Sequence, residues 1–404
     1  MTLRVLLGND PVGTIERQEH GRTVFRFDRA YLEMPERPVL GRWFEDRLGP
    51  SFEYVEQGNR LPPFFQNYLP EEHSALRTLL ARRAGVKRRD EVPLLAALGE
   101  DLPGAIVVRA AEPGALSSDD TSPDSPLREQ GTPRLRFSLA GMQLKFSVLE
   151  SRDRFTLPVS GLGGKWIAKL PDRRYARVPE NECSMLTWAR AIGIDVPDFR
   201  LVPVTEIEGL PPELHFAEPN ALVVRRYDRG PGDERIHQED FAQVLGKRPV
   251  EDEKYGSASS ATLAKIVRLV CGEGDYEALI RRLVFVVLSG NADAHLKNWS
   301  LVYPDRRRPR LSPAYDLVCT FAYGQELDQG LALNLSREKD FTRITLKHFE
   351  RLAEKVGAPP ARTREIADES AARARGEWRR LRGELPMSDE AKQALDRHLG
   401  TLAL

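Results

Sequence analysis

Apolar and polar residues alternate in short runs through much of the first quarter of the chain. Residues 3–17 hold two apolar runs separated by the turn signal Gly8-Asn9-Asp10-Pro11, so this stretch predicts a β-hairpin. Another alternating run follows at residues 22–32. Between residues 70 and 100, leucine and alanine recur at helical spacing. The pattern therefore predicts an N-terminal α/β module over residues 1–110.

The next segment, residues 111–134, has a different composition. Serine, aspartate, proline and glycine dominate it and no apolar period survives, which is typical of a linker or a mobile loop. Short alternating runs then return, interrupted by one helical pattern at residues 180–194. Further on, helical periodicity dominates, as at residues 275–291. This order predicts a small β-rich lobe over residues 135–228 and a larger helical lobe over residues 229–404.

Composition narrows the class of protein. The length of 404 residues fits two or three domains. Lysine plus arginine and aspartate plus glutamate each number 60, so the net charge is zero and broad polyanion binding is not indicated. The three cysteines form no C-x-x-C pair, which argues against a disulfide framework or a cysteine zinc site. Because no apolar run could span a bilayer and no basic leader opens the chain, we expect a cytoplasmic protein without a membrane partner.

The most informative stretch is a polar run directly after the apolar pattern at residues 275–291. Asp293 and Asn298 stand five residues apart, the spacing of the protein-kinase catalytic loop, in which the aspartate accepts the substrate hydroxyl proton and the asparagine binds Mg²⁺. Asp316, expected at the end of an apolar strand, is a second candidate Mg²⁺ ligand. Taken singly, such residues could be turn or cap residues. Together they predict phosphoryl transfer from ATP with Mg²⁺.

A nucleotide site also needs cations for the phosphates. Lys169 lies in a short predicted strand, the environment of the lysine on strand 3 of protein kinases. Glu182, thirteen residues on and early in the next predicted helix, could pair with it. A segment between two predicted strands, with Gly141 and Lys145, is the candidate for covering the phosphates. The ordinary alternatives are an edge-strand lysine for Lys169 and a dipole-favoured glutamate for Glu182.

Several motifs occur in one order along the chain. They are FSLAGMQLKFSV, WIAKLPD, ALVVRRYDR, the segment from HQEDFAQVLG to KYG, SGNADAHLKNWSL and LSPAYDL. This order resembles the HipA family of bacterial serine/threonine kinases, the toxins of HipBA-type toxin–antitoxin modules. The resemblance covers most of residues 135–330 and extends weakly over the N-terminal module. It implies an α+β, bilobal, protein-kinase-like fold with an N-terminal α/β subdomain.

The resemblance also implies roles for particular residues. Asp293 is expected to be the catalytic aspartate, with Asn298 and Asp316 as the Mg²⁺ ligands. Glu182 is expected to pair with the ATP-phosphate lysine, and Ser138 to be the serine that family members autophosphorylate to switch themselves off. The expected ATP-binding residues are Gly141, Gln143, Lys145, Lys169, Val224, Tyr227 and Lys297. One departure is Arg225 in the expected adenine hinge, where the best-known member has an acidic residue.

For function, the resemblance implies ATP- and Mg²⁺-dependent transfer to a serine of a translation-related protein, such as glutamyl-tRNA synthetase, and arrest of growth. The implied partner is a HipB-like helix-turn-helix antitoxin, through which alone the chain would reach DNA. Two alternatives stay open. A small-molecule phosphotransferase of the aminoglycoside type shares the Asp–Asn spacing and the later Mg²⁺ aspartate. A non-catalytic co-repressor that only binds the antitoxin would keep the kinase shape without its chemistry.

Overall fold

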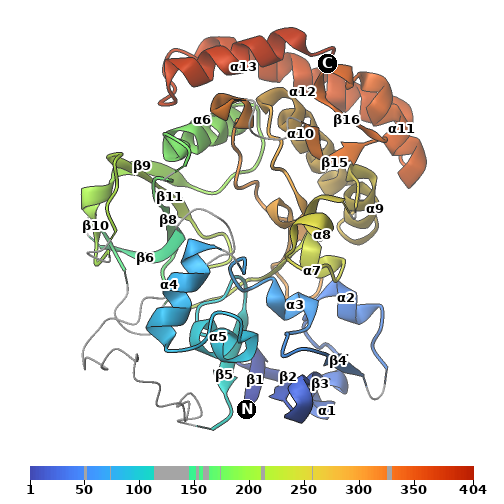
Figure 1. Ribbon diagram of the computed structural model, residues 1–404. Helices are drawn as coiled ribbons and strands as arrows, with labels where there is room; N and C mark the ends of the chain where they lie inside the picture. Colours follow the sequence, from blue (N-terminus) through green and yellow to red (C-terminus); the bar gives the residue numbers. More distant parts are fainter. Residues whose placement is uncertain are drawn as a thin grey trace.

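The computed structural model describes residues 1–49, 52–72, 74–112, 145–151, 154–157, 163–172, 174–210, 214–256, 258–324 and 330–404. Most of the predicted linker, together with Ser138, Gly141 and Gln143, lies outside these ranges. In Figure 1 the N-terminal module lies at the bottom, a second sheet at the left and the helical lobe at the top. The predicted α+β, bilobal arrangement with an additional N-terminal module is therefore confirmed.

The N-terminal module is built on a five-stranded antiparallel sheet in the order β4-β3-β2-β1-β5. The strands are β1 (Thr2–Leu7), β2 (Asp10–Arg17), β3 (Thr23–Phe27), β4 (Glu53–Glu56) and β5 (Ile106–Ala110), and the helices are α1 (Arg29–Leu32), α2 (Arg42–Glu45), α3 (Pro63–Gln66), α4 (Ala75–Ala84) and α5 (Glu91–Leu98). The predicted hairpin is confirmed: Leu7 pairs with Asp10, and Gly8 takes the φ of +66° that the tight turn requires.

The second sheet has six strands in the order β10-β7-β6-β8-β11-β9. Its strands are β6 (Lys145–Ser151), β7 (Arg154–Thr156), β8 (Trp166–Lys169), β9 (Phe199–Pro203), β10 (Ile207–Glu208) and β11 (Asn220–Arg225), and α6 (Val178–Ala191) connects β8 to β9. Lys145 of β6 stands directly opposite Lys169 of β8. Because opposed residues of an antiparallel pair project from the same face, this register places two lysines side by side.

The module and the six-stranded sheet share one hydrophobic core. Val5 and Phe25 of the module belong to the same cluster of buried side chains as Phe146 and Ala168 of the sheet. Helix α6 instead packs into the core of the helical lobe, where Trp188 is fully buried. Residues on both sides of the change in composition over residues 111–134 thus belong to one hydrophobic core.

A buried ionic cluster joins the module to the hinge that follows β11. The Arg226 guanidinium, 1% exposed, donates to Asp101 at 2.8 Å and to Asp228 at 2.9 and 3.0 Å. Arg229 donates to the same two carboxylates at 2.8 Å each, and the Gly104 N–H donates to Asp228 at 2.6 Å. Burial alone would raise the pKa of Asp228, but the two guanidinium groups hold it far below its ordinary value. The module therefore fixes the hinge.

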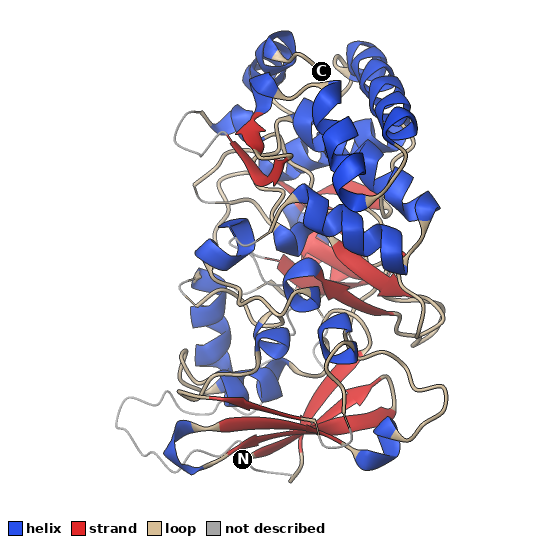
Figure 2. Cartoon of the chain, turned by 90° about the vertical axis from the view of Figure 1, so that its right-hand side faces the viewer, coloured by secondary structure: helices blue, strands red, loops and turns tan. Residues whose placement is uncertain are grey.

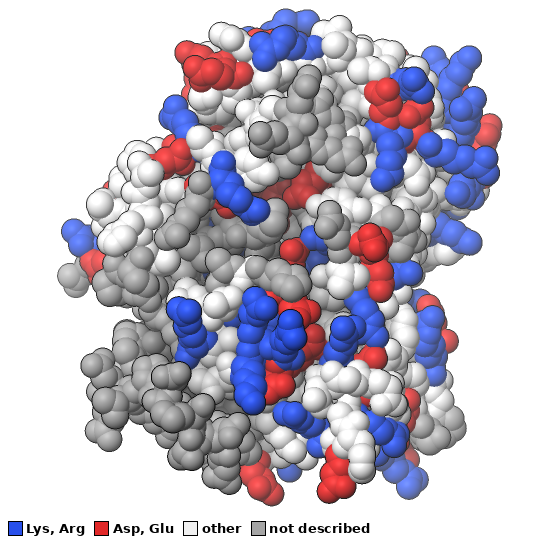
Figure 3. All heavy atoms as spheres, in the orientation of Figure 1, with Lys and Arg blue, Asp and Glu red and all other residues white. Residues whose placement is uncertain are grey.

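The helical lobe gathers at the end of the molecule opposite the module (Figure 2). Its elements are β12 (His237–Asp240), α7 (Phe241–Val244), α8 (Glu251–Gly256), α9 (Ser260–Val270), α10 (Glu273–Ser289), β13 (Ser300–Tyr303), β14 (Arg310–Leu311), β15 (Gly330–Leu335), β16 (Glu338–Asp340), α11 (Leu346–Val356), α12 (Pro360–Leu381) and α13 (Asp389–Thr401). Helix α10, predicted from its apolar run, is buried along most of its length. Within the described ranges, no helix has both the length and the apolar run needed to cross a bilayer. Basic and acidic side chains are interspersed over much of the face in Figure 3.

Glu239 of β12 is a buried carboxyl group at the contact between module and helical lobe. It accepts the Arg42 N–H at 2.9 and 3.2 Å and the Tyr303 hydroxyl. Burial raises the pKa of Glu239 from 4.5 to about 7. The pKa of Glu239 is higher in the folded state than in the unfolded state. At pH values between these two pKa values, the folded state therefore binds one more proton than the unfolded state. The stabilisation is complete below pH 4.5 and is lost as the pH rises to about 7.

We therefore expect Glu239→Gln, which stays neutral at every pH, to remove this dependence. The free energy of unfolding of the wild type should fall relative to that of the variant by about 3 kcal/mol between pH 4.5 and 7.5. Urea titrations of both proteins at a series of pH values measure the difference. Two stability curves that run parallel over this range would contradict the prediction.

Candidate active site

A pocket of about 740 Å³ opens among the six-stranded sheet, the hinge, the helical lobe and the part of the module that holds Asn67 and Glu71. Its size suits a nucleotide with room for an acceptor group. All the predicted site residues that the structure describes line it: Lys145, Lys169, Glu182, Val224, Tyr227, Asp293, Lys297, Asn298 and Asp316. The other three, Ser138, Gly141 and Gln143, fall outside the described ranges.

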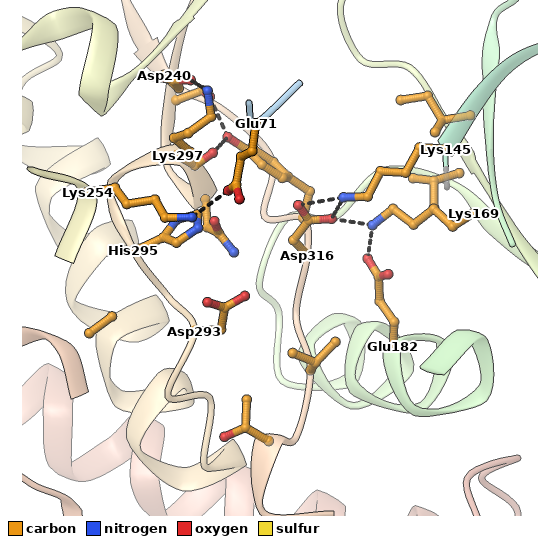
Figure 4. Close-up of a pocket in the computed structure, with 18 of the residues that line it drawn as sticks. Glu71, Lys145, Lys169, Glu182, Asp240, Lys254, Asp293, His295, Lys297 and Asp316 are labelled. Atoms are coloured by element: carbon orange, nitrogen blue, oxygen red, sulfur yellow. Dashed lines mark hydrogen bonds and ion pairs between the residues drawn. The ribbon is translucent and has the colours of Figure 1, made fainter. Parts of the chain in front are cut away.

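Four charged side chains meet on one side of the pocket (Figure 4). The Lys145 Nζ lies 3.0 and 3.1 Å from the two carboxylate oxygens of Asp316, and the Lys169 Nζ contacts both Asp316 and Glu182. Burial alone would raise the pKa of Asp316, but the two ammonium groups hold it well below its ordinary value. Burial also opposes the charge of Lys169, yet the two carboxylates raise its pKa. At neutral pH the pocket therefore presents Asp316 as a carboxylate and Lys169 as an ammonium group.

Asp316 reaches this cluster from irregular backbone, and the prediction that it ends an apolar strand is wrong. Strand β14 ends at Leu311. Pro313 has no N–H to continue a ladder, and the next N–H, that of Ala314, donates to the Asp195 carbonyl at 2.7 Å. Asp316 itself has a φ of +53°, in the left-handed region. Such a conformation is uncommon for a residue other than glycine and is found at many functional sites.

The loop that carries Asp293 begins where α10 ends. Gly290 caps the helix with a φ of +63°, which reverses the chain. The Thr320 hydroxyl then donates to the Gly290 carbonyl at 2.7 Å and accepts the Ala292 N–H at 3.1 Å. The Asn291 side chain accepts the Asp293 N–H at 3.1 Å. These bonds fix the loop backbone, while the Asp293 side chain remains exposed in the pocket.

Tyr255, which the sequence pattern did not reveal, contacts the Asp293 carboxylate. Tyr255 of α8 donates its hydroxyl hydrogen to Asp293 Oδ1, and its ring meets His295 edge to face with 5.0 Å between centroids. Burial lowers the pKa of His295, so this ring is neutral at pH 7. Helix α8 is short and mostly charged, so it has no apolar period from which the helix could be predicted. The only sequence signal for Tyr255 is its place in the family-like segment that ends in KYG.

Lys297 lines the pocket but directs its ammonium group toward the N-terminal module. Its Nζ lies 2.9 Å from both the carbonyl and the side-chain oxygen of Asn67, and 3.3 Å from Asp240. In Figure 4 it lies apart from Lys145 and Lys169. Burial lowers the pKa of Lys297. Its predicted contact with ATP stays a prediction, and the structure adds a hydrogen-bonded link between the loop that carries Asp293 and the module.

The end of β11 and the hinge that follows it place Val224, Arg225 and Tyr227 along another wall of the pocket. The Arg225 N–H donates to the Asp198 carbonyl at 2.7 Å, and the Arg225 guanidinium lies 3.7 Å from the carboxylate of the same residue. The predicted adenine contacts of Val224 and Tyr227 stay predictions.

Taken together, the fold and this pocket define a bilobal, protein-kinase-like protein. Comparison with known families specifies the group: residues 137–378 match the HipA-like C-terminal domain, and residues 3–109 match the HipA N-terminal domain. The chain belongs to the HipA family. The resemblance noted from the motifs is therefore confirmed.

Individual relatives support the same assignment. The chain is 41% identical over 408 residues to "Putative kinase Y4dM" of Sinorhizobium fredii, covering 100% of this chain and 97% of the relative. It is 26% identical over 335 residues to the "Serine/threonine-protein kinase toxin HipA" of Shewanella oneidensis, covering 74% of this chain and 72% of the relative. The solved complex of Shewanella oneidensis HipA, HipB and operator DNA shares the fold, with a TM-score of 0.72 at 21% identity over 99% of this chain and 95% of that one.

Proposed function

We propose that this protein is an ATP- and Mg²⁺-dependent serine/threonine kinase that phosphorylates a protein. The observation that carries the proposal is the convergence of Asp293, Asn298 and Asp316 with Lys145 and Lys169 on one pocket. These are the parts that phosphoryl transfer requires: a base for the acceptor hydroxyl, oxygen ligands for Mg²⁺ and cations for the phosphates.

The residues of the pocket fit a Mg²⁺ ion. Asp316 is a carboxylate that already accepts cationic groups on both of its oxygens, and Asn298 offers an amide oxygen in the same pocket. When bound, Mg²⁺ would neutralise charge on the β- and γ-phosphates. Lys145 and Lys169 bind phosphate oxygens, and Asp293 orients the acceptor hydroxyl and takes its proton. Positioning and charge neutralisation supply most of the rate in such transfers.

The biological setting is inferred from relatives. One relative is named as a HipA toxin, and the solved HipA structure of the same fold contains HipB and operator DNA. We infer that this chain acts as the toxin of such a module in the cytoplasm and binds a HipB-like antitoxin, through which it reaches DNA. A translation-related protein, for example glutamyl-tRNA synthetase, is the expected acceptor, with growth arrest as the outcome. Ser138 is the expected site of self-inactivation.

Incubation of the purified protein with ATP and Mg²⁺ tests the proposal. Intact mass followed by peptide mapping should find phosphate on Ser138 or on an added synthetase. Chelation of Mg²⁺ with EDTA should abolish the transfer, because Asp316 and Asn298 then have no ion to hold against the triphosphate. Transfer to an aminoglycoside and to no protein would instead identify a small-molecule phosphotransferase. Absence of phosphate on every acceptor would contradict kinase function.

A further inference from the structure

We propose that Tyr255 is a positioning residue for Asp293 and that the N-terminal module holds it in place. The proposal rests on the proposed kinase function, since it concerns the base of that reaction. Its starting point is the hydrogen bond from the Tyr255 hydroxyl to Asp293 Oδ1. This bond leaves the other carboxylate oxygen, Oδ2, for the acceptor hydroxyl. An exposed carboxylate without such a partner would sample several rotamers.

Contacts with its neighbours orient the Tyr255 ring. The ring packs edge to face on His295, at 5.0 Å between centroids, and the Lys254 Nζ lies 5.3 Å from the ring centroid. The Lys254 ammonium also forms an ion pair with Glu71, in which the lysine side chain is only 9% exposed (Figure 4). Glu71 belongs to the loop between α3 and α4 of the module. A charge pair thus links the module to the residue next to Tyr255.

The segment that precedes α8 is bound to the module as well. The Arg248 guanidinium donates to Glu56 of β4 at 2.8 Å and to Gln66 of α3 at 3.1 Å. The Asn67 side chain donates to the Lys247 carbonyl at 2.8 Å. Within α8, Glu253 accepts the Arg248 N–H at 2.8 Å. Residues 247–256 are therefore anchored on the module at both ends.

Helix α8 has only six residues, and a helix of that length is not stable alone. Its placement must come from these contacts and from the helical lobe beneath it. The module therefore contributes to the geometry of the catalytic carboxylate, although no hydrogen bond or ion pair joins Asp293 to the residues of the module that the structure describes. This is a function for the module in catalysis, separate from any role in partner binding.

Kinetics of Tyr255→Phe test the positioning role. The variant keeps the ring and its packing but loses the donor, so kcat should fall about tenfold or more, as for loss of a hydrogen bond to a charged group. The KM for ATP should stay within about twofold, because Lys145 and Lys169 hold the nucleotide. Tyr276→Phe, which removes a phenol hydrogen bond to Thr363 in the helical lobe, is the matched control and should leave kcat unchanged.

Glu71→Gln tests the contribution of the module. It should lower kcat about two- to fivefold in the wild-type background. When it is added to Tyr255→Phe, it should lower kcat no further, because both substitutions act through the same hydrogen bond. Glu45→Gln, which breaks the Arg37–Glu45 ion pair inside the module, is its control. Hydrogen exchange, which needs no activity, should show the amides of α8 exchanging about threefold faster or more in Glu71→Gln than in Glu45→Gln.

Three results would overturn the proposal: an unchanged kcat in Tyr255→Phe, a raised kcat, which would make the phenol a blocking group, or phosphate on Tyr255, which would make it an acceptor. A wild type that phosphorylates nothing refutes the kinase function instead. In that case equal exchange of α8 in the Glu71 and Glu45 variants would separately refute the link to the module.

Discussion

Asp293→Ala is expected to abolish phosphoryl transfer while the chain stays folded and still binds ATP. Loss of a general base lowers kcat by about 10²–10⁴-fold. The Asp293 side chain is exposed, and its loop is held by hydrogen bonds from backbone N–H groups to the side chains of Asn291 and Thr320. Removal of the Asp293 carboxylate should therefore not disturb the fold. Phosphate incorporation into Ser138 or an added protein measures the rate, and calorimetry with Mg²⁺ and ATP measures binding.

Two further variants sharpen this test. Asp293→Asn keeps an oxygen that can accept the Tyr255 hydroxyl but cannot take a proton, so it should be as inactive as the alanine variant. Asp368→Ala removes an exposed carboxylate from α12 and should retain the wild-type rate. Wild-type transfer by Asp293→Ala would exclude Asp293 as the base. Simultaneous loss of ATP binding would point to a structural role instead.

Asp101→Ala is expected to destabilise the protein by about 3–5 kcal/mol, because it leaves two buried guanidinium groups short of an acceptor. Arg226 and Arg229 both bond to this carboxylate, whose side chain is 1% exposed. Their charges cannot be hydrated where they lie. Denaturant titration of the wild type and the variant measures the difference in the free energy of unfolding.

The neighbouring residue provides the control for this variant. Glu100 pairs with Arg109 at the surface, where the two side chains are 33% and 57% exposed. Glu100→Ala should cost about 0–1 kcal/mol, the usual range for an exposed ion pair. If Asp101→Ala cost no more than Glu100→Ala, the cluster would not be what binds the module to the hinge.

Local patterns predicted much of this protein. The Asp293–Asn298 spacing, Lys169 and Asp316 could be selected from the sequence because each belongs to a short motif, and the long helices because they have an apolar period. Tyr255 and the Asp101–Arg226 pair could not be selected in this way. Tyr255 lies 38 residues from Asp293, and Asp101 lies 125 residues from Arg226. The six residues of α8, four of which are charged, carry no apolar period. The strand expected before Asp316 failed because Pro313 and a bond to Asp195 end the ladder early.

The shared core has a consequence for synthesis of the chain. The buried cluster of the module is not complete until Phe146 and Ala168, which belong to it, have left the ribosome. Strand β11, which ends at Arg225, belongs to the same sheet as these two residues. At roughly 5–20 residues per second, the emerging module waits on the order of ten seconds with an uncovered apolar face. Nascent chains paused just after the module should therefore recruit chaperones, and chains paused beyond β11 should release them.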